Sequence, residues 1–432
     1  MHYFSYAGNQ LYCEGVSVEA LAKKHGTPLY VYSQATLSHH FQKLDAALAP
    51  LEHLLCFAVK ANSNQAVLRA LAALGSGFDI VSGGELQRVI AAGGEPSKCV
   101  FAGVGKTAEE IELALERGVY CFNVESEPEL QRINRLAGRL KKTAPVAVRV
   151  NPNVAAQTHA KITTGTYENK FGVAFEQIEV LYARAARLPH LRLRGLQMHI
   201  GSQITGVGPF EEAVRKIVPL AHRLRAAHGL EFLSIGGGLG IVYQPALASG
   251  SPWWWESAAA KDLLTPHQYA ERLVPLLRPL GLRLLIEPGR FIVGNAGILV
   301  TRVEYVKRNG KKHFVIVDAA MNDLIRPAFY DAYHEIVPVR RRRALTVKSD
   351  VVGPICESGD FFCKDRPLPR AAEGEYLALM SAGAYGSVMA SNYNSRSLPA
   401  EVLVNGNRAA VVRERQPVQA IWSGEQPAPW QK

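Results

Sequence analysis

The chain of 432 residues lacks several features that mark whole classes of protein. It contains no run of eighteen apolar residues, and its first residues, MHYFSYAGNQLYCEG, have neither a basic start nor an apolar signal core. We therefore expect no membrane partner, no export and a cytoplasmic location. Cysteine is scarce and no CxxC, HxH or HExxH motif occurs, so we expect free thiols and no metal site. The six cysteines are Cys13, Cys56, Cys99, Cys121, Cys356 and Cys363.

Acidic residues are outnumbered, with 38 Asp and Glu against 49 Lys and Arg, which gives a formal net charge of +11. Such an excess suits either a nucleic-acid partner or a basic surface around an anionic ligand. The sharpest basic feature, Arg340 to Arg343, lacks the interleaved aromatic residues of a nucleic-acid reader. We therefore expect no nucleic-acid partner, and we interpret this run as surface or subunit-contact residues.

Short apolar runs alternate with amphipathic helical stretches from about residue 54 onward, which is typical of βα units and a parallel sheet. Eight such runs recur about every 32 residues, the spacing of a (β/α)8 barrel. A doubly wound sheet is the alternative. The expected strands are 54–62, 77–82, 99–104, 121–126, 146–152, 193–202, 232–238 and 284–290, and the clearest helices are 65–75, 84–94, 108–118, 127–140 and 211–229.

Helical periodicity fades after Arg290, and the following segment predicts two strands joined at Asn309 and Gly310, a hairpin signal. Further strands are expected over 346–353, 375–383 and 401–414, and residues 27–33 are expected to add another. The fold class is therefore α/β, a TIM-like barrel with a C-terminal antiparallel β domain completed by the N-terminal segment. The predicted limits are 1–34 for that segment, 35–286 for the barrel and 287–432 for the β domain.

Polar residues gather where the predicted barrel strands end, which is where barrels place their active sites. They are Lys60, Asp79, Ser82, Asn123, Glu125, Arg149, Asn151, His199, Ser202, Glu287 and Arg290. The run IGGGLG (235–240) follows the seventh strand, and Pro288-Gly289-Arg290 follows the eighth, where barrels often bind phosphate.

A lysine within an apolar strand, such as Lys60, is either an ion-pair member or an amine tuned for Schiff-base formation. A phosphate cradle, such a lysine and a carboxylate are together what pyridoxal phosphate requires. Glu287 is the candidate counter-charge for the pyridine nitrogen. His199 is either a core histidine or a residue that lies against the cofactor ring.

These motifs resemble the pyridoxal-phosphate-dependent decarboxylases of the alanine-racemase-like fold, and within them the diaminopimelate decarboxylase family, over nearly the whole chain. The motifs that carry the resemblance are FAVKAN (57–62), GFDIVSGGEL (77–86), THAKITTG (158–165), NKFG (169–172), HIGSQ (199–203), GGGLGI (236–241), EPGR (287–290), MNDLIRPAFY (321–330), CESGD (356–360) and AGAYG (382–386).

The resemblance implies decarboxylation of meso-2,6-diaminopimelate to L-lysine and CO2, the last step of lysine biosynthesis, with pyridoxal 5'-phosphate. It implies that Lys60 forms the Schiff base, that His199 stacks on the ring and that Glu287 meets the pyridinium. It further implies cofactor contacts by Gly236, Gly237, Gly238, Gly289, Arg290 and Tyr385, substrate contacts by Arg290, Arg326, Tyr330, Glu357 and Tyr385, and proton donation by Cys356.

The implied substrate carries an amino and a carboxylate group at each end, so its distal end must be held while the other reacts. Two arginines suit the distal carboxylate and Glu357 suits the distal ammonium. In this family the CESGD segment reaches the neighbouring subunit's active site, so the resemblance also implies a homodimer.

Three alternatives stay open at this point. Ornithine, arginine and carboxynorspermidine decarboxylases share the cofactor motifs, but Glu357 and Arg326 favour diaminopimelate. An alanine racemase has its basic residues in other motifs. A cofactor-free regulatory relative would not need Lys60, Glu287 and Cys356 together. The segment 246–264, with Trp253 to Trp255, is interpreted as a surface insertion, with a lid or subunit contact as the alternative.

Overall fold

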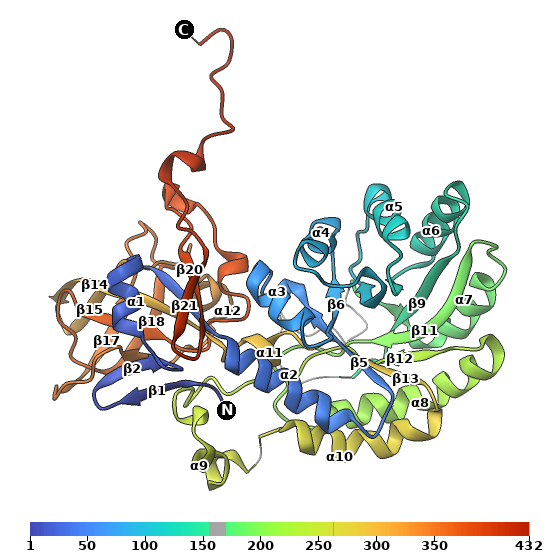
Figure 1. Cartoon of the computed structure of the whole chain (residues 1–432), viewed down its shortest axis with the longest axis horizontal. Coiled ribbons are helices and arrows are strands. Elements are labelled where there is room, and N and C mark those ends of the chain that lie inside the picture. The colour runs from blue at the N-terminus through green and yellow to red at the C-terminus, as the bar shows by residue number, and fades with distance from the viewer. Residues whose placement is uncertain (155–169, 262, 432) are drawn as a thin grey trace. The chain divides into compact units, whose positions relative to one another are not determined.

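The computed structural model describes residues 1–154, 170–261 and 263–431 (Figure 1). The chain divides into two compact units, one of residues 37–241 and 255–293, the other of residues 1–36, 242–254 and 294–432. The first is called the barrel unit and the second the β unit. The domain boundaries after residues 34 and 286 remain predictions from the sequence. None of the helices in the described part of the chain is both long and apolar enough to cross a bilayer.

The barrel unit contains the eight parallel strands that the sequence predicts, so the barrel is confirmed and the doubly wound alternative is wrong. The spatial order is β9-β11-β12-β13-β5-β6-β7-β8, and β8 pairs with β9 to close the ring. The strands are β5 (His53–Ala58), β6 (Gly77–Ile80), β7 (Cys99–Phe101), β8 (Cys121–Val124), β9 (Ala144–Asn151), β11 (Leu191–Met198), β12 (Phe232–Ser234) and β13 (Arg283–Ile286), and the short β10 (Val173–Ala174) extends β9.

Several of the helices that follow the strands begin at a residue whose side chain caps them. Ser82, Thr107 and Ser126 accept hydrogen bonds from the first turns of α4, α5 and α6, and Thr107 forms a full capping box with Glu110. The helices of this unit are α2 (Gln34–Leu48), whose first residues belong to the β unit, α3 (Gln65–Ala72), α4 (Gly83–Ala91), α5 (Ala108–Arg117), α6 (Glu127–Arg139), α7 (Ile178–Ala185), α8 (Gly208–His228), α10 (Pro266–Leu277) and α11 (Arg290–Val293).

An apolar layer fills the lower part of the barrel and leaves polar groups to the strand ends. Phe232 lies in this layer with Leu54, Val100 and Leu285. Gly195 makes room for it, since a Cβ at this position would lie 2.4 Å from the Phe232 ring. The barrel is therefore packed at one end, and side chains with other chemistry occupy the other.

The β unit contains a sheet of strand order β18-β17-β15-β14-β4-β20-β21, with β19 paired to β14 and β16. The predicted hairpin forms, with Asn309 paired to Lys312, and a second hairpin pairs Asn405 with Arg408. The sheet is mixed, which corrects the purely antiparallel expectation, because β4 runs parallel to β20 and β15 parallel to β17. Its strands are β4 (Leu29–Ser33), β14 (Gly297–Asn309), β15 (Lys312–Val317), β16 (Ile336–Pro338), β17 (Thr346–Val352), β18 (Phe361–Pro369), β19 (Tyr376–Leu379), β20 (Ala400–Asn405) and β21 (Arg408–Arg413).

The remaining elements of the β unit lie in its N-terminal part, in the 242–254 segment and between its strands. A small sheet of β1 (Phe4–Ala7), β2 (Gln10–Cys13) and β3 (Val16–Ser17) precedes α1 (Val18–His25), and α9 (Pro252–Trp255) and α12 (Arg326–Tyr330) are short. The predicted N-terminal strand is confirmed as β4, which lies between β14 and β20. Of the tryptophans in α9, Trp254 is buried and Trp253 is exposed.

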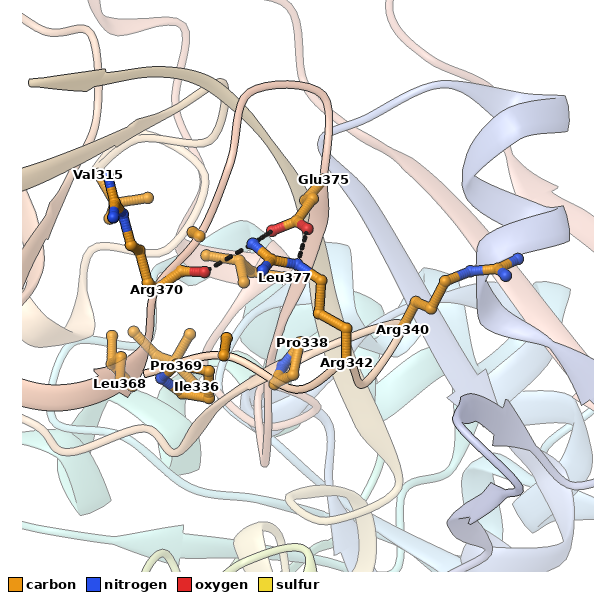
Figure 2. A pocket seen from close by; sticks show the side chains of 12 residues that line it. Val315, Ile336, Pro338, Arg340, Arg342, Leu368, Pro369, Arg370, Glu375 and Leu377 are labelled. Carbon is orange, nitrogen blue, oxygen red and sulfur yellow. Dashed lines mark hydrogen bonds and ion pairs between the residues drawn. The ribbon is translucent and has the colours of Figure 1, made fainter. Parts of the chain in front are cut away.

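The basic run ties surface segments of the β unit together. Arg340 forms an ion pair with Glu19 of α1, and Arg341 stacks on the Tyr6 ring at 3.6 Å. Figure 2 shows Arg342 turned toward Glu375 and the backbone oxygen of Arg370, beside a small apolar hollow. That hollow contains none of the predicted site residues. Exposed ion pairs contribute about 1 kcal/mol or less, so the run fixes loop geometry more than it stabilises the fold.

Candidate active site

Lys60 and Asp79 form an ion pair at the barrel's strand ends. Lys60 lies in the 3-10 turn Val59–Ala61 just after β5, and its Nζ donates to Asp79 Oδ2 on β6. This corrects the expectation of a lysine within a strand: β5 ends at Ala58, and the Lys60 side chain is 41% exposed. Asp79 is buried, so the pair satisfies its charge and leaves the amine accessible.

Glu287 is buried just after β13 and accepts hydrogen bonds from side chains on three other strands, β12, β8 and β11. Ser234 Oγ and Asn123 Nδ2 donate to its Oε1 at 2.7 and 3.3 Å, and Gln197 Nε2 donates to its Oε2 at 3.0 Å. Burial and, less strongly, the nearby Asp79 raise the pKa of Glu287 to about 7, against the opposing effect of the Ser234 hydrogen bond. A cationic group beside this carboxylate would be strongly favoured.

His199 is hydrogen-bonded to the glycine loop that follows β12. The Gly237 N–H donates to His199 Nδ1 at 3.2 Å, and burial lowers the pKa of His199 well below its usual value, so the ring is neutral with its proton on Nε2. The loop lies so close to the residue after β13 that a Cβ on Gly237 would be 2.2 Å from the Glu287 carbonyl oxygen. Gly236 and Gly238 have φ of +71° and +107°, conformations that favour glycine.

The glycine loop offers fewer free donors than its composition indicates. The Gly236 N–H donates to Ser234 Oγ and the Gly237 N–H to His199 Nδ1, while among the described residues the Gly238 N–H has no partner. Arg290, at the start of α11, lies nearby in the sequence motif EPGR and donates from Nη2 to Ser202 Oγ at 3.1 Å. A phosphate group would therefore rely on few backbone donors here.

A second buried ion pair lies at the carboxyl ends of β8 and β9. Arg149 Nη1 donates to Glu125 Oε1 at 2.9 Å, the Gly172 N–H donates to the other carboxylate oxygen, and the Arg149 guanidinium lies 4.7 Å from the centre of the Phe171 ring. Two predicted positions have other roles. Ser82 caps α4, and Asn151 Oδ1 accepts the Asn153 N–H.

Four buried polar atoms at the strand ends have no hydrogen-bond partner in the described part of the chain. They are Asp79 Oδ1 on β6, Asn123 Oδ1 on β8, Arg149 Nη2 on β9 and Gln197 Oε1 on β11. Unpaired buried polar atoms are rare, and a cluster of them indicates a place for a polar ligand. Together with an accessible lysine, a buried carboxylate and the closely packed glycine loop, they fit pyridoxal phosphate.

Three of the other predicted residues, Arg326, Tyr330 and Tyr385, lie in the β unit. Arg326 is buried at the start of α12, and Tyr330 at its end packs edge-on against Phe329 with 4.6 Å between ring centres. Tyr385 has φ of +56°, a conformation that costs a non-glycine residue about 1 kcal/mol or more and often marks functional positions.

The CESGD loop presents Cys356 and Glu357 at the surface of the β unit. Cys356 is exposed, whereas the other five cysteines are buried, and all six are free. The buried Asp360 fixes the conformation of the loop, since its carboxylate accepts hydrogen bonds from the N–H groups of Ile355 and Met321 at 2.8 and 2.7 Å. Tyr393 donates to Glu357 Oε2 at 3.1 Å.

Sequence reasoning missed Gln197, Ser234 and Asp360. Gln197 and Ser234 are polar residues near the carboxyl ends of β11 and β12, and the alternation of side chains along a strand could have placed them on the inner face with Glu287. Asp360 acts through backbone N–H groups, which no residue pattern predicts. The THAKITTG motif and Asn169 lie outside the described residues. No cluster of three His, Cys, Asp or Glu in the described part is arranged to hold a metal ion.

Comparison with known proteins agrees with this geometry. Residues 34–294 match the family described as pyridoxal-dependent decarboxylase, pyridoxal binding domain, which covers every barrel strand. The diaminopimelate decarboxylase of Pseudomonas aeruginosa is 51% identical over 429 residues, covering 98% of this chain and 99% of that protein.

Solved structures show the same likeness. Diaminopimelate decarboxylase from Helicobacter pylori, complexed with L-lysine, is 39% identical with a TM-score of 0.87 and covers 94% of this chain and 98% of its own. The enzyme from M. jannaschii, in co-complex with L-lysine, is 34% identical with a TM-score of 0.90 and covers 99% of this chain and 98% of its own. The predicted resemblance is thus confirmed, and the chain belongs to the diaminopimelate decarboxylase family of pyridoxal-dependent decarboxylases.

Proposed function

We propose that this chain decarboxylates meso-2,6-diaminopimelate to L-lysine and CO2, the last step of lysine biosynthesis. The observation that carries the proposal is the buried Glu287 carboxylate, which three strands hold beside the Lys60–Asp79 pair in a chain of this family. A carboxylate with a pKa near 7 in a buried site is matched to a cationic ring nitrogen. The enzyme is therefore a carboxy-lyase that depends on pyridoxal phosphate.

Pyridoxal phosphate, when bound, supplies an electron-poor ring that accepts the electron pair left when CO2 departs. Lys60 would hold its aldehyde carbon, and Glu287 would keep its ring nitrogen protonated. Neutral His199 lies in the same site and offers a flat ring to lie against the cofactor. Gly236, Gly237, Gly238, Gly289 and Arg290 form the segments that would hold its phosphate, and Tyr385 is a further contact.

The substrate roles follow from charge. Arg290 and Arg326 would hold the distal carboxylate through paired N–H donors, and Tyr330 would add a hydrogen bond. Glu357 would take the distal ammonium, with Tyr385 as a further contact. The exposed Cys356 thiol is the proposed proton donor to the carbon that has lost CO2.

A homodimer with active sites shared across its interface is part of the proposal. What supports it is the exposure of Cys356 and Glu357, since a proton donor and an ammonium ligand need a partner surface to exclude water. Light scattering tests this directly: a monomer that is fully active would contradict a shared site. The cytoplasmic location stays a prediction from the sequence.

The experiment that tests the function is CO2 release from purified protein with pyridoxal phosphate, offered meso-diaminopimelate, L-ornithine, L-arginine and L-lysine in parallel. We expect turnover of diaminopimelate alone. Turnover of ornithine or arginine would retain the cofactor site and overturn the assignment of Arg326 and Glu357. A colourless protein without a pyridoxal absorbance band would overturn the cofactor site as well.

A further inference from the structure

Arg326 is a buried cation that lacks a carboxylate partner within the described residues. Arg326 is 6% exposed, and within the described residues its side-chain hydrogen bond and its cation–π contact are both with Tyr243. A buried arginine normally pairs with Asp or Glu, because leaving its charge uncompensated in the interior is costly. The unmatched charge therefore indicates that an anion from outside the chain belongs beside it.

Tyr243 contacts the guanidinium in two ways. Arg326 Nη1 donates to the Tyr243 hydroxyl oxygen at 2.6 Å, and the guanidinium carbon lies 5.1 Å from the centre of the ring. The ring in turn packs edge-on against buried His334, with 5.4 Å between ring centres. His334 is fixed by a 2.8 Å hydrogen bond between Nδ1 and the Met380 carbonyl.

The segment that carries Tyr243 is anchored to the β unit. His2 Nε2 bonds the carbonyl oxygen of Ala246 at 2.8 Å, and the Leu247 N–H donates to Glu335 Oε2 at 2.7 Å. Gly250 packs so closely on His2 that a Cβ there would lie 2.6 Å from the imidazole ring. Residues 242–254 thus serve as a support for Tyr243 within the β unit, which gives part of the predicted surface insertion a structural role.

We propose that Tyr243 is a positioning residue for Arg326 and thereby selects substrates that carry a distal carboxylate. A tyrosine stabilises the cation through its ring and hydroxyl without neutralising it, whereas an acidic residue would compete with the substrate's carboxylate. One of the five guanidinium N–H donors is used by the hydroxyl, and the others stay available for a two-point contact with a carboxylate. This inference rests on the proposed function, since Arg326 is the clamp residue in it.

The test compares Tyr243→Phe, which keeps the ring, with Tyr243→Leu, which removes ring and hydroxyl. Tyr6→Phe is the matched control, because Tyr6 also stacks on an arginine and donates its hydroxyl to the Pro338 carbonyl in the same unit. Two ligands separate the ends of the substrate: L-lysine keeps the distal carboxylate, and cadaverine, its decarboxylated form, does not. The assays are steady-state turnover of diaminopimelate and inhibition by each ligand.

We expect Tyr243→Phe to raise KM for diaminopimelate and the inhibition constant of L-lysine together by about 3- to 10-fold, and Tyr243→Leu by tenfold or more. The kcat should stay within about threefold, because the distal carboxylate is bound equally in the ground and transition states. Inhibition by cadaverine should not change, and Tyr6→Phe should match the wild type in every assay.

Several outcomes would overturn the positioning role: an unchanged KM in both variants, a loss of kcat at constant KM, or weaker binding of cadaverine in parallel with lysine. If Tyr243→Leu does not fold, Tyr243→Phe decides the question alone, since it keeps the packing volume. Failure of the wild type to release CO2 from diaminopimelate would instead overturn the proposed function, so the two failures are distinguishable.

Discussion

Ser234 donates a 2.7 Å hydrogen bond from its hydroxyl to Glu287 Oε1, the shortest of three side-chain bonds that this buried carboxylate accepts. The bond favours the ionised carboxylate against the effect of burial, which raises the pKa of Glu287 to about 7. Ser234 thus helps to keep Glu287 negatively charged at neutral pH, the state that a protonated ring nitrogen requires.

Removal of this bond should shift the pH dependence of the enzyme. In Ser234→Ala the pKa of Glu287 rises, so the acid limb of the kcat/KM profile should move to higher pH, and activity at pH 7 should fall by about tenfold. The measurement is a pH profile from 5.5 to 9. Ser76→Ala is the control, because Ser76 is also buried in the barrel unit but donates to backbone oxygens away from Glu287. An unshifted limb would contradict the role of Ser234.

Glu287 should also make the cofactor-free protein less stable as pH rises. Its pKa is about 7 in the folded chain and near 4.5 when unfolded, so the folded state binds more protons between these values and stability falls through that window. The loss is at most about 3 kcal/mol and is complete above pH 7.

Glu287→Gln should therefore be more stable than the wild type at pH 8, with the difference disappearing by pH 5. A glutamine at position 287 keeps these hydrogen bonds if the Gln197 amide flips. Gln197 Oε1 has no partner in the described part of the chain, so after the flip it can accept the N–H of the new glutamine. Denaturant unfolding of both cofactor-free proteins at several pH values measures this. A difference that is constant with pH would show that ionisation of Glu287 is not its cause.

Lys60 should determine whether the cofactor is covalently held. Lys60→Ala should lack the visible absorbance band of the wild type after gel filtration with pyridoxal phosphate, and its CO2 release should fall by several orders of magnitude. Lys98→Ala is a matched control, because Lys98 also forms an ion pair with a carboxylate in the barrel unit, that of Glu95, outside the site. Retention of the band in Lys60→Ala would assign the attachment to another amine.

The barrel was predictable because its signals are local. Strand and helix periods alternate along the chain, and each strand end coincides with residues such as Lys60 and Glu287. The predicted strands ran two to four residues too long in several cases, as for 54–62 against β5 (His53–Ala58). One cause is that apolar, buried residues such as Val59, Ala102 and Ile235 follow a strand after the backbone has already turned.

Other parts of the proposed site depend on contacts between residues that lie far apart in the sequence. Tyr243 and Arg326 lie 83 positions apart, and Asp360 holds the CESGD loop through backbone N–H groups. The resemblance to known decarboxylases supplied the residues of the β unit, since Arg326, Tyr330 and Glu357 would otherwise read as surface residues. The mixed sheet was missed because β4 and β20 pair across most of the chain.

Cys356 should be the first cysteine to react with iodoacetamide, because it is the exposed one among six free thiols, and burial raises the pKa of others such as Cys56. Mass spectrometry after brief treatment should find one modified peptide, and turnover should fall in proportion to its modification.

In Cys356→Ala, turnover should fall by about 100-fold while the cofactor absorbance stays, because a general acid is lost but the barrel site is intact. The variant should also resist inactivation by the reagent. Full turnover in Cys356→Ala would exclude the thiol as the proton donor, and its exposure would then have no catalytic explanation.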